Sequence, residues 1–229
     1  MTAATALDPT LTRPLYTLRG AAAIVGVPPS TLHTWARGRG YKGIDGTQYR
    51  SDALITTTGT GRGAVVPFIG LAEAYVLAGF RAAGVPMQRI RPALKHLETK
   101  IGVVAALTSE RLKTDGAEVL WDYRSDSGHQ EIVDELVVIR NQQAVFRDVV
   151  EQYLQTITYR HGRVAIIGLP QYQTEVVVDP LRNFGRPMLA RRAIRVEDIT
   201  GRIEAGEEIE AVALDFNLDL AEVHALVAA

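Results

Sequence analysis

Residues 16–37 read YTLRGAAAIVGVPPSTLHTWAR, and this stretch decides the fold of the front of the chain. Thr17 is expected to cap a short helix, because its side-chain oxygen can accept a hydrogen bond from a backbone N–H of the first turn. Gly26 then supplies the positive φ that a tight turn needs. A second helix begins at Pro28-Pro29, where the missing N–H costs nothing since the first N–H groups of a helix lack partners. The stretch therefore predicts a helix-turn-helix.

The second of these helices is expected to have two different sides. Leu32 and Trp35 recur at helical spacing and face inward. Helix-turn-helix proteins place the second helix in the major groove of DNA, where hydroxyl, imidazole and guanidinium groups reach base edges and phosphates. The residues predicted to do so here, all on the outer face, are Ser30, Thr31, His33, Thr34 and Arg37. The alternative is a small helical core with a solvated polar face.

The segment that follows, residues 38–67, is rich in Gly and Thr and predicts a β-hairpin, or wing. Residues 48–50 and 54–58 are expected to form strands, and residues 59–63 a turn at the wing tip. This Gly-rich turn lacks the Lys-Ser/Thr pair and the following helix that a phosphate-binding loop needs. Cations on and beside the wing are expected to hold the DNA backbone next to the groove: Arg39, Lys42, Arg50 and Arg62.

The charge of the chain is divided unevenly, which favours a nucleic-acid partner for the front half. Residues 1–100 carry 12 Lys and Arg against 5 Asp and Glu, whereas residues 101–229 carry 13 against 21. The two halves nearly cancel, so the net charge is only −1. Residues 10–44 hold five bases and no acid. A basic front and an acidic rear indicate two partners of different kinds.

Composition excludes several classes of protein. With 229 residues, of which 47% are hydrophobic and 22% charged, the chain is globular and long enough for one or two domains. It has no cysteine, which excludes disulfides, thiolate metal sites and cysteine nucleophiles. The five histidines lack metal-ligand spacing, and no nucleotide-binding or hydrolase motif is present. We expect no cofactor, no metal and no enzymatic activity. A cytoplasmic protein is expected, since neither a run of about 18 apolar residues nor a signal peptide occurs.

The chain as a whole predicts an α+β fold that is mainly helical. Residues 1–14 are expected to be a flexible lead-in, 15–102 the winged helix-turn-helix, 103–178 a small mixed α/β segment and 179–229 a C-terminal helix-turn-helix. Amphipathic helices are expected at residues 69–80 and 86–101, because apolar side chains recur there at helical spacing.

Short elements are predicted in the rest of the chain from apolar spacing and turn residues. Helices are expected at residues 107–113, 143–155, 196–204, 209–215 and 220–227. Strands are expected at 119–123, 136–139, 157–160, 164–169 and 175–178, with a hairpin turn at His161-Gly162. Residues 185–187 are expected to turn, and residues 191–195 to be short and extended.

Two resemblances to known families follow from particular motifs. Leu15-Tyr16-Thr17-Leu18, residues 22–27, Thr31-Leu32 and Trp35 resemble the start of MerR-type winged helix-turn-helix domains, and residues 70–77, 84–86 and 90–91 continue the pattern. This resemblance implies binding of duplex DNA as a homodimer. Two features depart from it: Pro28 stands where these proteins often have a capping serine, and their long C-terminal dimer helix is missing.

The end of the chain carries the second resemblance. Asp179-Pro180 and residues 184–187, 194–199, 205–210 and 215–218 are similar to a small helix-turn-helix domain of antitoxins encoded beside PIN-domain ribonucleases. Together with the MerR-like front, the chain resembles VapB-type antitoxins. The resemblance implies that it binds and silences a VapC-like toxin and represses its own operon.

The charges of this last segment admit two interpretations. Residues 196–229 hold nine Asp and Glu and only Arg202 as a base, so phosphate would repel them and protein contact suits them better. An acid-free basic run precedes them: Arg182, Arg186, Arg191, Arg192 and Arg195. PIN ribonucleases hold divalent metal with carboxylates, and a guanidinium could pair with those carboxylates. Alternatively, these arginines neutralise the acidic helices of their own domain.

Two other functions remain open at this stage. The chain is either an independent MerR-like transcription regulator whose middle segment binds a small effector, or a protein-interaction module with no DNA role. A toxin gene directly beside this one counts against the former, and a steep salt dependence of DNA binding counts against the latter.

Overall fold

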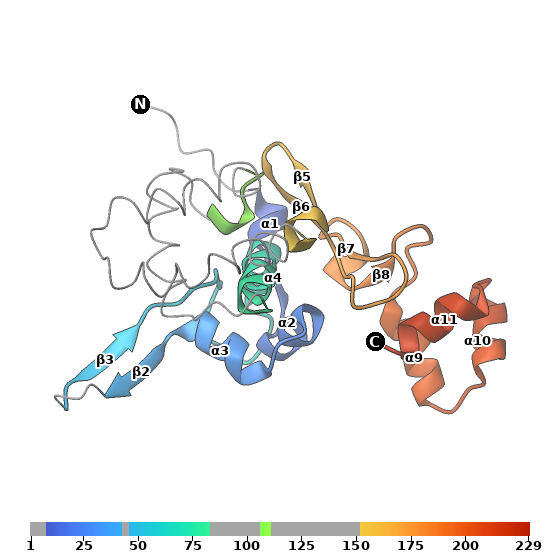
Figure 1. Ribbon diagram of the computed structural model, residues 1–229, viewed down its shortest axis with the longest axis horizontal. Coiled ribbons are helices and arrows are strands. Elements are labelled where there is room, and N and C mark those ends of the chain that lie inside the picture. Colours follow the sequence, from blue (N-terminus) through green and yellow to red (C-terminus); the bar gives the residue numbers. More distant parts are fainter. Residues whose placement is uncertain (1–7, 43–45, 83–105, 111–151) are drawn as a thin grey trace, which may run out of the picture. The chain divides into compact units, whose positions relative to one another are not determined.

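The computed structural model describes residues 8–42, 46–82, 106–110 and 152–229, and it divides into two compact units (Figure 1). The first unit comprises residues 1–155 and 159–164, and the second comprises residues 156–158 and 165–229. The expected domain boundary at residue 178 therefore lies within the second unit, and the one at residue 102 lies outside the described residues. Helices and short sheets both occur, which confirms the α+β class.

The predicted helix-turn-helix is confirmed. Helix α2 (Leu18–Val25) is capped by Thr17, whose Oγ1 accepts a hydrogen bond from the Gly20 N–H at 3.0 Å. Gly26 ends the helix with φ +73°, a left-handed conformation that glycine adopts without a steric penalty. Helix α3 (Pro29–Arg37) follows, with Leu32 and Trp35 buried as expected.

The segment expected to be a flexible lead-in is folded over residues 8–14, while residues 1–7 lie outside the described part. Helix α1 (Pro9–Thr12) is capped by Asp8, whose carboxylate accepts the Thr10 N–H at 2.8 Å, and this bond lowers the pKa of Asp8. Strand β1 (Pro14–Tyr16) pairs antiparallel with β4 (Val66–Pro67). The reason is burial, because Leu11 and Tyr16 are both withdrawn from solvent.

Helix α4 (Phe68–Ala82) is the centre of the first unit (Figure 1). The predicted amphipathic face is absent, because every residue from Phe68 to Phe80 is buried. Elements α1, α2, β1, β4 and the 3₁₀ helix η1 (Ala106–Thr108) all pack against it. A helix covered on every side is mostly apolar all round, and Glu73 is the one acid among the buried residues of α4. The helix expected at residues 86–101 lies outside the described residues.

Two features fix α4 against the loop that precedes it. The buried carboxylate of Glu73 accepts hydrogen bonds from the Thr56 N–H at 2.5 Å and from the Thr56 hydroxyl at 3.1 Å. A Cβ on Gly70 would lie 2.2 Å from the Thr56 carbonyl oxygen, so only glycine permits this approach. The loop and the helix are therefore joined by backbone contact as well as by side chains.

The wing forms earlier in the chain than predicted. Strand β2 (Arg39–Lys42) pairs antiparallel with β3 (Gln48–Ser51), with Tyr41 opposite Tyr49. Residues 54–58 are not a strand, because the Leu54 and Ile55 N–H groups donate to the Trp35 carbonyl and Thr56 is held by Glu73. Residues 59–63 form bends outside the hairpin rather than its tip. Arg62 is therefore not on the wing.

The hairpin predicted at His161-Gly162 is confirmed. Strands β5 (Ile157–Arg160) and β6 (Arg163–Gly168) flank two residues of positive φ, 54° and 73°, which is the two-residue turn that suits twisted strands. Strands β7 (Val176–Val178) and β8 (Met188–Leu189) complete a sheet of order β5-β6-β7-β8. The strands expected at 119–123 and 136–139, and most of the helices expected at 107–113 and 143–155, lie outside the described residues.

The C-terminal helices occupy nearly the predicted ranges. Helices α9 (Val196–Glu204), α10 (Ile209–Phe216) and α11 (Leu220–Val227) pack against one another around Ile199, Val212 and Val223. Residues 191–195 are not extended as expected. They form part of a turn, in which Ala193 has φ +57° and the Leu189 N–H donates to the Ile194 carbonyl at 2.9 Å. The turn lets the chain return to β8 before α9 begins.

The close approach at Gly70 generates a stability prediction. Alanine favours a helix over glycine by about 1 kcal/mol, yet Gly70→Ala is expected to lower the free energy of unfolding by about 1–3 kcal/mol because of overpacking against Thr56. Urea denaturation measures this. Gly61→Ala is the control, since among the described residues no atom beyond its two chain neighbours lies within 4 Å of its Cβ position. Equal stability of the two variants would contradict the account.

Candidate nucleic-acid interface

The five side chains predicted for the outer face of α3 differ in their exposure to solvent. Ser30 and His33 are exposed, whereas Thr31, Thr34 and Arg37 are half-buried. The Thr34 hydroxyl donates to the Ser30 carbonyl at 3.0 Å. Arg81, from the end of α4, donates to the Thr31 hydroxyl at 2.9 Å. Ser30 and His33 are thus the most accessible of the predicted base-contacting residues.

Arg37 has a place in the structure that its sequence position did not reveal. Its Nη1 donates to the Gly59 carbonyl at 2.5 Å, and its own carbonyl accepts a hydrogen bond from Arg50 Nη2 at 3.2 Å. Its Nη2 is buried and has no hydrogen-bond partner within the described part of the chain. Arg37 therefore ties α3 to the residue 59 loop and to the wing, which fixes the angle between the helix and the hairpin.

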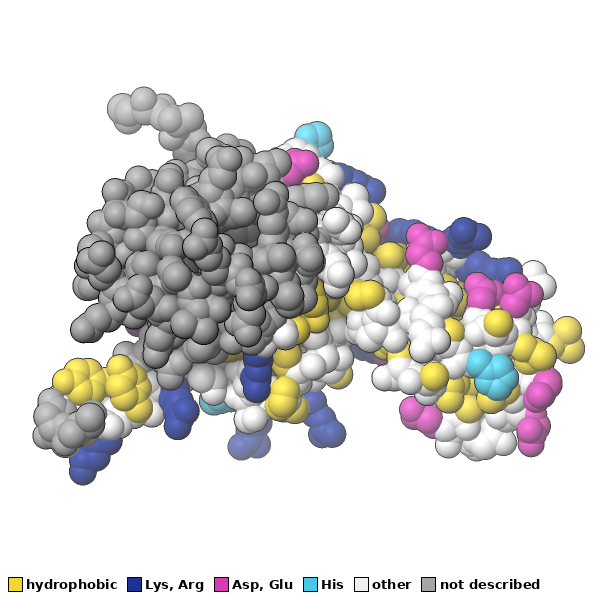
Figure 2. Space-filling view, viewed as in Figure 1, with side chains coloured by type: hydrophobic (Ala, Val, Ile, Leu, Met, Phe, Trp, Pro, Cys, Tyr) yellow, Lys and Arg dark blue, Asp and Glu magenta, His cyan; other side chains and the backbone are white. Residues whose placement is uncertain are grey.

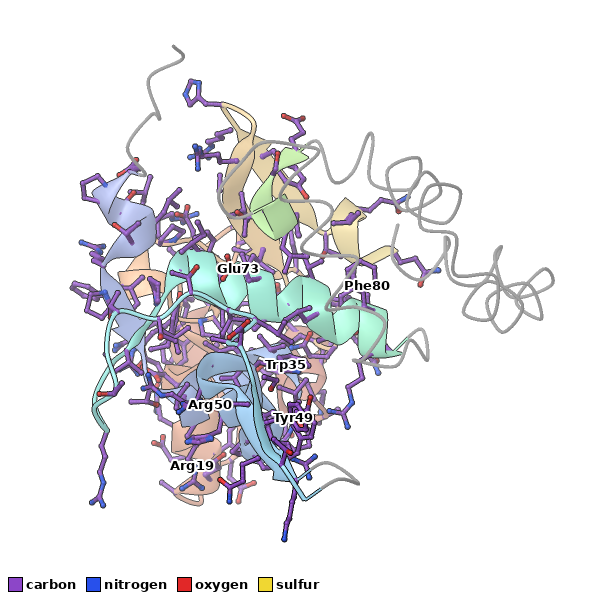
Figure 3. The ribbon with its side chains drawn as sticks, turned by 90° about the vertical axis from the view of Figure 1, so that its left-hand side faces the viewer. Arg19, Trp35, Tyr49, Arg50, Glu73 and Phe80 are labelled. Carbon is purple, nitrogen blue, oxygen red and sulfur yellow. The ribbon has the colours of Figure 1, made fainter. Side chains whose placement is uncertain are left out.

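Cations gather on the side of the first unit formed by α2, α3 and the hairpin. Figure 2 shows Lys and Arg side chains along the lower edge of this unit. In Figure 3, Arg19 and Arg50 lie towards that edge, whereas Glu73 lies on α4, beyond Trp35. The described acids of residues 8–82 are Asp8, Asp52 and Glu73, and the last is buried. The surface is consequently cationic, as a phosphate-binding surface must be.

The hairpin divides its side chains between two faces. Strand register places Lys42 and Arg50 on one face and Arg39 with Tyr41 on the other, because side chains alternate along a strand. The rings of Tyr41 and Tyr49 stack at a centroid distance of 5.6 Å and are about half exposed. Sequence reasoning missed this pair and Arg81. The strand sequences Arg-Gly-Tyr-Lys and Gln-Tyr-Arg-Ser could have indicated the tyrosine pair, because only one register places the two tyrosines opposite each other.

The five C-terminal arginines divide by partner. Arg186 binds both oxygens of Glu197 at 2.7 and 2.5 Å, Arg195 binds Asp198 at 2.8 Å, and Arg191 lies 3.5 Å from Glu175. These three pair with acids of their own domain. Arg182 and Arg192 donate instead to the carbonyls of Ala190 and Asn217. Among the described residues, neither pairs with a carboxylate.

Arg202 is the base that the acidic helices share. It donates to both oxygens of Glu207 and, at 2.7 Å, to Asp215, and its guanidinium lies 5.5 Å from the centre of the Phe216 ring. The hydrogen bond from Arg202 lowers the pKa of Glu207, and the same bonds raise the pKa of Arg202. This cluster joins the end of α9 to α10 in a part of the chain that is otherwise acidic.

Comparison with known proteins identifies the family. Residues 14–94 match a family described as "Putative DNA-binding HTH domain", and residues 176–228 match "Protein of unknown function (DUF433)". The chain is 44% identical to "Putative antitoxin VapB45" of Mycobacterium tuberculosis (strain ATCC 25618 / H37Rv), over 90% of this chain and 89% of that protein. The chain belongs to the VapB45 family. The predicted resemblance to VapB-type antitoxins is thereby confirmed.

Two further relatives of this VapB45-family chain come from the same organism. It is 26% identical to "Uncharacterized protein Rv2308", over 93% of this chain and 88% of that protein. It is also similar to the X-ray crystal structure of Rv2018 from Mycobacterium tuberculosis, with 36% identity and a TM-score of 0.76, over 95% of this chain and 99% of that chain. The likeness to MerR-type domains stays a prediction.

The two family matches separate the two groups of candidate residues in this VapB45-family chain. The first match contains α3 and the hairpin, and the second contains the five arginines and α9 to α11. Within the described ranges, no helix combines the length and the apolar character needed to cross a bilayer.

The Arg202 cluster generates a pH prediction. Because the folded-state pKa of Glu207 lies below its unfolded value, this carboxylate stabilises the fold above the unfolded pKa of about 4.3, and the contribution is lost as pH falls through the folded pKa. Glu207→Gln is therefore expected to lower the melting temperature at pH 7. Between about pH 5 and pH 3, the melting temperature of this variant is expected to fall less steeply than that of wild type.

The matched control for this pH prediction is Glu204→Gln at the end of α9, three residues before Glu207, since Glu204 is exposed and pairs with no cation among the described residues. Thermal unfolding followed by circular dichroism gives both melting temperatures across the pH range. Identical pH profiles for the two variants would refute the role of Glu207.

Proposed function

We propose that this chain is the antitoxin of a type II toxin–antitoxin pair, which binds operator DNA as an autorepressor and neutralises a PIN-domain, VapC-like ribonuclease. It acts in the cytoplasm as a homodimer and has no catalytic role of its own. The name of the relative VapB45 and the DNA-binding description of the matched N-terminal family support this proposal. The observation that carries the DNA-binding part is the cationic face of α2, α3 and the hairpin.

DNA recognition uses this face in two ways. Ser30 and His33, exposed in the first half of α3, reach base edges in the major groove. Arg19, Arg39, Lys42 and Arg50 neutralise phosphates on either side and set the register on the duplex. Arg37 acts indirectly, because its bonds to Gly59 and Arg50 hold the wing at a fixed angle to α3.

A two-fold dimer follows from the geometry of such recognition. Helix-turn-helix dimers bind two half-sites about one helical turn apart, so a palindromic operator mirrors the symmetry of the protein. One dimer then covers one operator, so a single dimer is sufficient for autorepression.

Toxin binding uses the second unit. Arg182 and Arg192 donate only to backbone carbonyls within the described chain, so their guanidinium groups can exchange these bonds for stronger charge-assisted bonds to carboxylates. The metal-holding carboxylates of a PIN ribonuclease are such partners, and pairing with them displaces the metal. Arg186 and Arg195 are already engaged with Glu197 and Asp198 and serve the fold.

Salt dependence tests the DNA-binding part. The double variant Arg39→Ala/Lys42→Ala is expected to reduce the slope of log affinity against log salt concentration by about 2, one for each lost phosphate contact. The probe is a duplex from upstream of this chain's own gene, and fluorescence anisotropy measures the affinity. Arg182→Ala/Arg191→Ala removes the same charge from the second unit and is expected to leave the slope unchanged. A slope that is unchanged in the first variant would contradict the proposed interface.

Co-purification tests the toxin-binding part. The chain alone carries a tag and is co-expressed with the product of the adjacent gene, and native mass spectrometry weighs the complex. The expected result is a stable complex with a small protein that degrades RNA only after this chain is removed. A lone dimer that still binds its own promoter DNA would instead indicate a stand-alone regulator.

A further inference from the structure

A strained turn in the second unit presents two large apolar side chains to solvent. Three consecutive residues, Asn183, Phe184 and Gly185, have φ of +48°, +55° and +71°. Asparagine and glycine tolerate the left-handed region, but phenylalanine rarely adopts it. The Phe184 side chain is nevertheless 76% exposed, and that of Leu181, three residues earlier, is 64% exposed. Neither side chain gains burial from the turn that displays it.

The turn is fastened on both sides by polar groups. The buried carboxylate of Asp179 accepts the Leu181 N–H at 2.9 Å. The Asn183 amide donates to the Ala193 carbonyl at 2.5 Å, and Arg186 is bonded to Glu197. Strained backbone persists only where the surroundings over-determine it, and it concentrates at functional positions. These hydrogen bonds therefore hold the turn in a conformation in which the Phe184 and Leu181 side chains project into solvent.

We propose that Leu181 and Phe184 form an apolar anchor that inserts into a pocket on the toxin. This inference rests on the proposed function and names the surface through which the second unit acts. The pocket that fits is apolar with carboxylates at its rim, because Arg182 lies between the two anchor residues in sequence. Arg182 also reaches the Ala190 carbonyl, next in the chain to Arg191 and Arg192. Charge complementarity thus fixes the chemistry of the partner.

A protein partner fits the anchor better than a nucleic acid does. Single-stranded nucleic acid stacks its bases on aromatic rings, and the aliphatic side chain of Leu181 offers no such surface. The same unit holds α9 to α11, where nine acids face one arginine and repel phosphate. A few buried residues, among which aromatic side chains and arginine are enriched, supply most of the affinity of protein interfaces. A turn already fixed in its binding conformation loses little entropy when it docks.

The variant Phe184→Gly separates binding from folding. Glycine adopts φ +55° without strain, so the melting temperature of the free full-length chain is expected to stay the same or rise. The affinity for the co-expressed product of the adjacent gene is expected to fall by about 30-fold or more, as for a hot-spot residue. Leu181→Ala is expected to weaken the same complex. Leu214→Ala is the matched control, because Leu214 is 81% exposed on α10, and the affinity is expected to stay within about two-fold of wild type.

The possible outcomes distinguish this inference from the function on which it rests. If the wild-type chain captures no partner, the proposed function fails, and the anchor has no toxin pocket to enter. If wild type binds and both anchor variants bind equally well, the anchor is wrong while the proposed function stands. A fall in the melting temperature of Phe184→Gly larger than the added unfolded-chain entropy of glycine accounts for would show that the ring packs within the fold, which overturns the inference. Loss of operator binding in place of toxin affinity would assign the turn to nucleic acid and overturn it as well.

Discussion

The burial of α4 on every side is the constraint on which the first unit depends. A helix without a solvent face needs partners all round, and α1, α2, β1, β4 and η1 supply them. The one carboxylate of α4, that of Glu73, accepts hydrogen bonds from the Thr56 N–H and hydroxyl. Gly70 lets the same loop approach the backbone of α4. These contacts fix the loop that leads away from the wing. Because Arg37 joins α3 to that loop at Gly59, the position of α3 is set from the core outward.

Local signals in the sequence were sufficient wherever a structure is decided by neighbouring residues. Thr17 and Gly26 marked the ends of α2, and His161-Gly162 marked a hairpin, because caps and tight turns depend on a few adjacent groups. Contacts distant in sequence defeated the same reasoning. The wing was misplaced because residues 54–58, predicted to be one of its strands, are held instead by Trp35 and Glu73, which are distant in sequence. The bond of Arg37 to Gly59 spans 22 residues, and no periodicity in the sequence indicates it.

Charge separates the two units in a way that suits two partners. The first unit carries exposed cations around α3, while residues 196–229 of the second carry nine acids and only Arg202 as a base. Internal ion pairs occupy Arg186 and Arg195, so the structure narrows the candidates for partner contact to Arg182 and Arg192, together with Arg191 at its longer distance from Glu175. Under the proposed function, phosphate and the protein partner bind to different units.

Hydrogen exchange of the full-length chain is the most direct test of whether the two units bind different partners. Exchange is measured for the chain alone, with a duplex from its own promoter, and with the product of the adjacent gene. Our prediction is that DNA slows exchange in α3 and the hairpin and leaves α9 to α11 unchanged, whereas the protein partner slows exchange across residues 179–195. Slowed exchange of α9 to α11 by DNA, with none in α3, would contradict it.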